Sequence, residues 1–258
     1  MKRCLLVLAS TLFAANAAAN ELFMATIPVE ASTSLSSIAD GDLTARLWTT
    51  HASGIQDIVS GFDGIEVIVT TPEAITLRFT QSPSRIEPPS DQHSLPSFVI
   101  DSEAESVSAI AVSLGNAPTV DELTDFVFEH IDNKTYSRGF DLAAQVAESG
   151  EGDCTEHAVL LAALARHYEY PARVTLGVVL IENRRDVLAY GHAWTEIFVD
   201  GVWQVADATR LSDDRSVRGV RYIPLGGLDN EGLGYAMSLL EHAARFPARI
   251  SDIDNADE

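Results

Sequence analysis

Cysteine is nearly absent from this 258-residue chain, which contains only Cys4 and Cys154. Cys4 lies in an N-terminal stretch where a basic pair precedes an apolar run and then small residues, a pattern that predicts a secretory signal peptide over residues 1–19. Once that leader is removed, Cys154 is the only cysteine, so no internal disulfide is expected. A lone thiol in an oxidising compartment is vulnerable to oxidation, so its presence favours a chemical use.

Basic residues are also scarce. The chain has 17 Lys plus Arg against 38 Asp plus Glu, a net charge of −21, which becomes −23 when the basic residues Lys2 and Arg3 leave with the leader. Such a chain is a poor partner for nucleic acid or an anionic membrane surface. Beyond the leader, no run is long enough and free enough of charge to span a bilayer. We therefore expect an exported protein, periplasmic or secreted, without a membrane span.

The first half of the chain is strand-like. "GIEVIVT" (64–70) and "AITLRFT" (74–80) flank a short turn containing proline, which predicts a hairpin with one buried face. A loop rich in proline and serine follows over residues 81–97, and "VSAIAVSL" (107–114) is interpreted as a further strand. We find no motif that carries chemistry in this half. The expectation is a small β-rich domain over residues 20–116.

Helical signals begin after residue 116. Thr119 followed three residues later by Glu122 is a capping box, which predicts a helix over about residues 120–131. A shorter helix over residues 140–149 is expected to end at Gly150. These elements open a second domain, expected over residues 117–250, and the last residues, 251–258, are expected to be an acidic, frayed tail.

A third helix is predicted to begin within "EGDCTEHA" (151–158). Asp153 serves as N-cap and Glu156 follows at the third helical position, so Cys154 becomes the first residue inside the helix. A helix N-terminus carries about half a positive charge, which favours a thiolate over a thiol. The Cys154 backbone N–H, unpaired in the first turn, could also donate to an oxyanion.

Strands are predicted downstream, and Asp200-Gly201 is a strong signal for a two-residue hairpin turn. If Val199 pairs with Val202, paired residue numbers add up to 401 along the hairpin. Residues then alternate between the two faces, and the shared face holds these four side chains: His192, Trp194, Asp207 and Thr209. His192 and Asp207 are diagonal neighbours in this register, so an imidazole–carboxylate hydrogen bond is feasible.

These features fit a cysteine nucleophile. A carboxylate orients the imidazole, and the other ring nitrogen exchanges a proton with the thiol. Each part also has a structural reading: a cysteine at a helix start, a histidine in a strand and an aspartate that caps a turn are all common without catalysis. A zinc site is less well supported, because Cys154 and His157 have the spacing of a half-site but no second close pair completes four ligands.

Three segments, "GDCTEHAVLLAALAR", "YPARVTLGVV" and "GHAWTEIFVDGVWQVADAT", resemble the motif blocks of the transglutaminase-like superfamily in its bacterial branch. The resemblance covers about residues 120–210. It implies an α+β fold with a papain-like transglutaminase core, in which a helix carrying the cysteine packs on an antiparallel sheet. It also implies that Cys154 is the nucleophile, His192 the base and acid, and Asp207 the orienting carboxylate.

Other residues match the family by position. Trp194, Trp203 and Arg173 correspond to positions interpreted as structural. Animal transglutaminases use an upstream indole to stabilise the oxyanion, but this chain has no tryptophan between Trp48 and Trp194. Two residues are therefore candidates for the oxyanion partner: Gln145 and Tyr136.

The expected function is that of an exported thiol enzyme that acts on amide bonds of a protein or peptide substrate through an acyl-thioester. Release of the acyl group to water or to an amine stays open, because both reactions share the first half of the mechanism. No cofactor and no metal are expected. The alternative is a catalytically silent binding or accessory module, while acyl transfer of the arylamine acetyltransferase kind fits the cysteine block less well.

Overall fold

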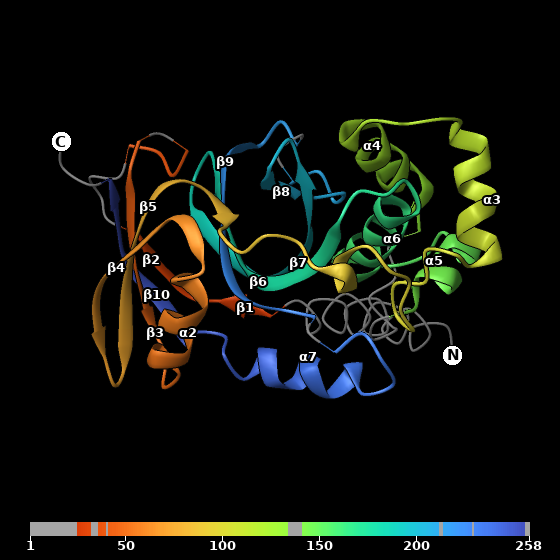
Figure 1. Ribbon diagram of the computed structural model, residues 1–258. Helices are drawn as coiled ribbons and strands as arrows, with labels where there is room; N and C mark the ends of the chain where they lie inside the picture. Colours follow the sequence, from red (N-terminus) through yellow and green to blue (C-terminus); the bar gives the residue numbers. More distant parts are fainter. Residues whose placement is uncertain are drawn as a thin grey trace, which may run out of the picture.

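The computed structural model describes residues 25–31, 36–39, 41–133, 141–211, 214–228 and 230–255. The predicted leader over residues 1–19 lies outside these ranges. Two five-stranded sheets lie side by side, and a group of helices covers the end of one of them (Figure 1). None of the helices in the described ranges combines the length and the hydropathy that a bilayer crossing requires.

The first sheet is antiparallel throughout and has the order β1-β7-β6-β9, with β8 also paired to β7. Its strands are β1 (Thr26–Ile27), β6 (Ala172–Asn183), β7 (Val187–Val199), β8 (Val202–Ala206) and β9 (Val217–Gly227). β7 and β8 form the predicted hairpin at Asp200-Gly201. Their pairs run from Val199 opposite Val202 to Thr195 opposite Ala206, so the predicted register is confirmed.

The second sheet has the order β2-β10-β3-β5-β4. Its strands are β2 (Val29–Ala31), β3 (Leu43–Trp48), β4 (Phe62–Thr71), β5 (Ala74–Arg85) and β10 (Arg249–Asn255), and the helix α2 (Ala52–Val59) packs against it. β4 and β5 are the hairpin predicted from residues 64–80, with Thr71 opposite Ala74 at the turn.

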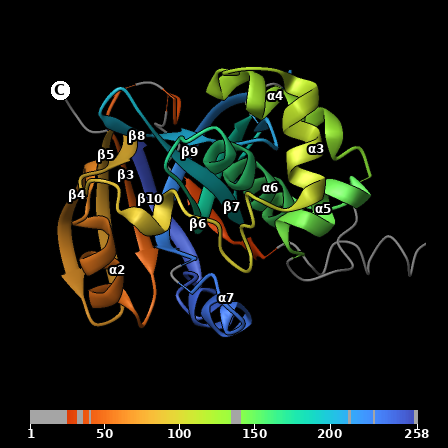
Figure 2. The same ribbon diagram turned by 45° about the vertical axis from the view of Figure 1, so that its right-hand side comes forward.

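Helices α3, α4 and α5 surround α6 at the other end of the molecule (Figure 2). The remaining helical elements are the 3₁₀ turn η1 (Asp91–His93) and the helices α3 (Glu105–Leu114), α4 (Val120–His130), α5 (Ala143–Ser149), α6 (Cys154–His167) and α7 (Tyr235–Ala243). The predicted starts of α4 and α6 are confirmed, each with its capping box. Gly150 ends α5 in the left-handed conformation, with φ 61°.

The strand β6 links the two hydrophobic cores. Val174 and Leu176 pack in the core beneath the helices, and Val178 and Leu180, on the same face of the strand, pack in the core shared with the second sheet. Thr195 on β7 donates from its hydroxyl to the Ala158 carbonyl of α6 at 2.9 Å. The helix that begins with Cys154 is thus fixed directly on the antiparallel sheet, as the α+β expectation requires.

Two predictions are wrong. Residues 107–114 belong to helix α3, because Val107, Ile110 and Ala111 recur at helical spacing and are buried. The segment from Ser251 to Asn255 belongs to strand β10 and not to a frayed tail, because Ile250 and Ile253 are fully buried between β2 and β3. The acidic residues of this segment concealed its apolar pattern.

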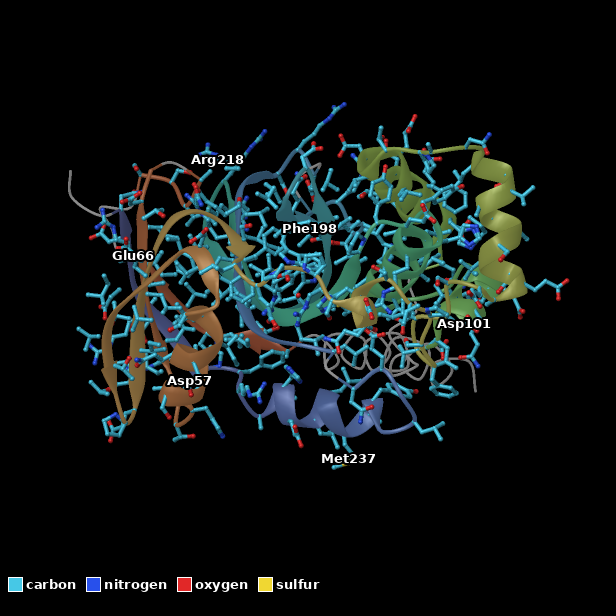
Figure 3. All side chains as sticks on the ribbon, in the orientation of Figure 1. Asp57, Glu66, Asp101, Phe198, Arg218 and Met237 are labelled. Carbon is cyan, nitrogen blue, oxygen red and sulfur yellow. The ribbon has the colours of Figure 1, made fainter. Side chains whose placement is uncertain are left out.

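The helix α7 lies at the periphery, beneath the rest of the molecule in the view of Figure 3, where the labelled Met237 points away from the body. Leu233, Met237 and Leu240 are all more than half exposed. The opposite side of this segment, through Tyr235 and Leu239, packs against the core beneath the helices.

We expect Ile250→Ala to lower the free energy of unfolding by about 2–5 kcal/mol, because it leaves a cavity in a fully buried site of β10. Urea denaturation followed by circular dichroism measures this change. Ile68→Ala is the matched control, since Ile68 lies in the same sheet but is 51% exposed and should cost less than about 1 kcal/mol. Equal losses in the two variants would contradict the placement of β10.

Candidate active site

Cys154 begins α6 at a well-capped helix start. Asp153 Oδ1 accepts the Thr155 N–H at 2.9 Å, and Glu156 Oε2 accepts the Asp153 N–H at 2.8 Å. These bonds hold the half-buried thiol at the positive end of the helix. Within the described part of the chain, the Cys154 backbone N–H has no hydrogen-bond acceptor, as expected for the first turn of a helix.

The hairpin of β7 and β8 brings His192 to Asp207. His192 lies within β7, and Asp207 follows the last residue of β8. His192 Nε2 is 2.8 Å from Asp207 Oδ2, and the two side chains are 6% and 7% exposed. The imidazole–carboxylate contact predicted from the turn is confirmed.

The imidazole also lies near the nucleophile candidate, because the Cys154 thiol is one of the groups that raise the pKa of His192. Since Nε2 is occupied by Asp207, Nδ1 is the ring nitrogen left to exchange a proton with sulfur. The structure therefore brings the three residues predicted from separate blocks, Cys154, His192 and Asp207, into one chain of contacts.

Asp207 has two partners that the sequence did not reveal. Tyr222, on β9, donates from its hydroxyl to Asp207 Oδ2 at 2.9 Å, the same oxygen that faces His192. Thr209 donates to Oδ1 from its N–H at 3.0 Å and from its hydroxyl at 2.6 Å. Both carboxylate oxygens are thus fixed, and the orientation of the carboxylate is determined.

The charges of these groups depend on one another. Burial on its own lowers the pKa of His192, but the Asp207 carboxylate, followed by the Cys154 thiol, raises it to about 10. Burial likewise opposes the charge of Asp207, yet His192 and the hydrogen bonds from Thr209 lower the pKa of that carboxyl to about 2. Burial, followed by the Asp207 charge, raises the pKa of Tyr222, so its hydroxyl remains a donor. Both shifts favour the pair of imidazolium and carboxylate.

Trp194 holds the imidazole from the same face of β7. Its ring stacks near His192, with centroids 6.2 Å apart, and lies 5.1 Å from the Tyr222 ring. Gly177 makes room for it, because a Cβ there would lie 2.8 Å from Trp194 Cη2 and 2.1 Å from the Ile223 carbonyl oxygen. Trp194 is 1% exposed, which supports a packing role.

Arg173 and Trp203, the other two residues that match positions of the family, also make contacts within the protein. Arg173 faces Glu196 across β6 and β7, with Nε 3.8 Å from Oε2. Trp203 donates from its indole N–H to the Glu87 carbonyl at 2.7 Å. The Arg173 contact joins two strands of the sheet, and the Trp203 contact joins the sheet to the segment after β5.

No hydrogen bond joins Gln145, the first oxyanion candidate, to the described triad residues. Gln145 is exposed, and its amide oxygen accepts the Leu142 N–H at 3.2 Å, so it caps its own helix. Tyr136 lies outside the described residues. His157, the other member of the zinc half-site, directs Nδ1 to the Asp153 carbonyl at 2.6 Å. In the described ranges, no group of three or more His, Cys, Asp or Glu side chains is arranged to hold a metal ion.

Residues 109–208 match the family model of the transglutaminase-like superfamily. This range contains the helix start with Cys154, the strand with His192 and the position of Asp207. A search of curated proteins finds no match.

Solved structures give weaker likenesses. A candidate cysteine protease from Cytophaga hutchinsonii is 17% identical, with 73% of this chain and 77% of that chain covered and a TM-score of 0.45. The periplasmic domain of TgpA from Pseudomonas aeruginosa is 14% identical, with 67% and 73% covered and a TM-score of 0.45. A candidate protease from Parabacteroides distasonis is 16% identical, with 73% and 42% covered and a TM-score of 0.31.

Replacing Asp207 by Asn should lower the pKa of His192, because it removes the charge that raises it. Ring ¹⁵N NMR should show an imidazole that is protonated at pH 8 in the unmodified chain and largely neutral there in the variant. Protonated His192 stabilises the fold fully below pH 6.5, its ordinary value, and this contribution is lost as the pH rises through about 10. The stability difference between the two proteins should therefore shrink as the solution becomes alkaline.

The control for this titration is Asp214→Asn, because Asp214 is an exposed carboxylate that accepts the Ser216 N–H at 2.7 Å. It should leave the His192 titration unchanged. An imidazole that titrates alike in the unmodified chain and in the Asp207→Asn variant would show that the carboxylate does not control its charge.

Proposed function

Because residues 109–208 of this chain belong to the transglutaminase-like superfamily, we propose that it is a thiol enzyme that breaks amide bonds through an acyl-thioester on Cys154. The observation that carries the proposal is the buried contact between His192 and Asp207 beside a thiol at a helix N-terminus. A protein that used this region only for binding would have no need of a histidine held in charged form against the thiol.

In the proposed first step, the Cys154 thiol has passed its proton to Nδ1 of His192, and the resulting thiolate attacks the carbonyl carbon of a peptide or amide bond. His192 gives its Nδ1 proton to the departing nitrogen, so the C–N bond breaks, an amine leaves and an acyl-thioester remains. Asp207 holds the ring through Nε2 during this transfer. Among the described residues the Cys154 N–H has no acceptor, so it can donate to the oxyanion in the tetrahedral intermediate.

In the second step, His192 takes a proton from water or from an amine, which attacks the thioester. The C–S bond breaks, the acyl group leaves as an acid or a new amide, and the proton on His192 restores the starting pair. The triad is the same in both cases, so peptidase or amidase activity and transglutaminase-type transfer are both consistent with it. The leader predicted over residues 1–19 supports a location of this activity in the periplasm or the medium.

We expect Cys154→Ala to abolish turnover and labelling by a thiol-reactive probe, because Cys154 is the only thiol in the chain after the predicted leader. A peptide library incubated with and without a primary amine, and analysed by mass spectrometry, measures turnover. Amine incorporation identifies a transferase, while cleavage or deamidation identifies a hydrolase. Turnover that survives this substitution would show that Cys154 is not the nucleophile, while no turnover in the unmodified chain supports the silent module instead.

Tyr222→Phe should lower kcat by about tenfold and leave KM nearly unchanged, because it removes one hydrogen bond to the buried Asp207 carboxylate. Tyr190→Phe is the matched control. Tyr190 and Tyr222 flank the same residue, Val179, on opposite sides of β6, so both rings lie on one face of the sheet. If steady-state kinetics show equal effects of the two substitutions, a role of Tyr222 in the site is contradicted.

A further inference from the structure

Glu156 is a buried acid close to the nucleophile that the triad does not use. It is the third residue of α6, two positions after Cys154, and only 1% exposed. A carboxyl group that loses its water needs hydrogen bonds from the protein to remain there. The hydrogen-bond partners of Glu156 therefore indicate which parts of the chain this residue holds together.

The Glu156 carboxyl group joins two separate backbone segments. Oε1 accepts the Asp141 N–H at 2.8 Å, and Oε2 accepts the Asp153 N–H at 2.8 Å. Gly152 permits this approach, because a Cβ there would lie 2.2 Å from Glu156 Cβ and 2.5 Å from its Cγ. The carboxyl group thus connects the chain that leads into α5 with the residue that immediately precedes Cys154.

We infer that Glu156 is a positioning residue for Cys154, which fixes the start of α6 so that the thiol and its backbone N–H point at the reacting carbonyl. The inference rests on the proposed function. It follows from the geometry: the Asp153 N–H is held by Glu156 and the Asp153 side chain holds the Thr155 N–H, so the backbone on both sides of Cys154 is restrained.

A comparison with the start of α4 separates positioning from ordinary capping. Glu122 occupies the same position in the capping box of α4, where its Oε2 accepts the Thr119 N–H at 2.7 Å. Glu122 is exposed, and the bonds from Thr119 lower its pKa. Glu122 therefore stays a carboxylate at neutral pH and reaches only its own helix.

Glu156 behaves differently because burial, followed by the Asp153 carboxylate, raises its pKa to about 7. The described titratable residues that meet it are Asp153 on its own helix and Asp141 from the α5 side. Protonation makes one oxygen a hydrogen-bond donor and weakens its acceptance of a backbone N–H. The link is complete above pH 7 and weakened below it, so the position of Cys154 becomes dependent on pH.

The test compares E156Q with E122Q in the full chain. The Gln side chain keeps the shape but has one acceptor oxygen and does not titrate, so E156Q loses one of the two bonds at every pH. We expect kcat to fall at least about tenfold with KM within about twofold, since small displacements of a nucleophile cost much of the rate. The unmodified chain should lose activity as the pH falls through about 7, and E156Q should lack that step.

E122Q should match the unmodified chain in kcat, KM and pH profile. The rate of Cys154 alkylation by iodoacetamide gives a second readout that needs no substrate, and it should change in E156Q alone. Equal kinetics, pH profile and alkylation rate in E156Q and E122Q would show that Glu156 is only a helix cap and would overturn the inference.

The proposed function fails separately, through turnover that survives Cys154→Ala, and the alkylation rate still tests Glu156 in that case. If circular dichroism shows that E156Q does not fold, E156D replaces it. This variant keeps the charge but is one methylene too short to reach both amides, so it should show the same loss of kcat at unchanged KM. An E156D variant with the activity and alkylation rate of the unmodified chain would equally contradict the inference.

Discussion

The hydrogen bond between His192 and Asp207 is the interaction on which the rest of the site depends. Two ionised groups that are almost without solvent can persist only if each is neutralised by the other and each remaining polar atom has a partner. Tyr222 and Thr209 supply those partners for the carboxylate. The arrangement keeps a charged imidazole beside the thiol, and the proposed acyl transfer uses that charge.

The fold supplies the scaffold for this bond from strands that are far apart in the sequence. β7 and β8 fix the distance between His192 and Asp207, and β9, on the other side of β6, contributes Tyr222. The packing of Trp194 over Gly177 leaves the imidazole little freedom to turn. The nucleophile comes from a different layer, since α6 meets the sheet through Ala158 and Thr195. The site is therefore assembled where a helix start meets a hairpin.

Local signals in the sequence were sufficient for most of this site. The turn at Asp200-Gly201 sets the register of β7 and β8, and the pair of Asp153 and Glu156 marks the start of α6. Tyr222 could not be foreseen, because its contact with Asp207 depends on which strand pairs with the far edge of β6, and no turn specifies that choice. Strand β10 was missed for a similar reason: its partners β2 and β3 lie more than 200 residues earlier in the chain.

The prediction of a strand over residues 107–114, which belong to helix α3, was wrong because local sequence alone does not decide the structure of this segment. A window of small and apolar residues at 107–114 fits either period when it is read alone, and packing against α5 and α6 decides for the helix. Acid-quenched reactions analysed by peptide mass spectrometry test the proposed covalent intermediate most directly. We expect an acyl adduct on Cys154 that forms and decays during turnover. Turnover with Cys154 unmodified at every time point, or with the adduct on another residue, would contradict the proposal.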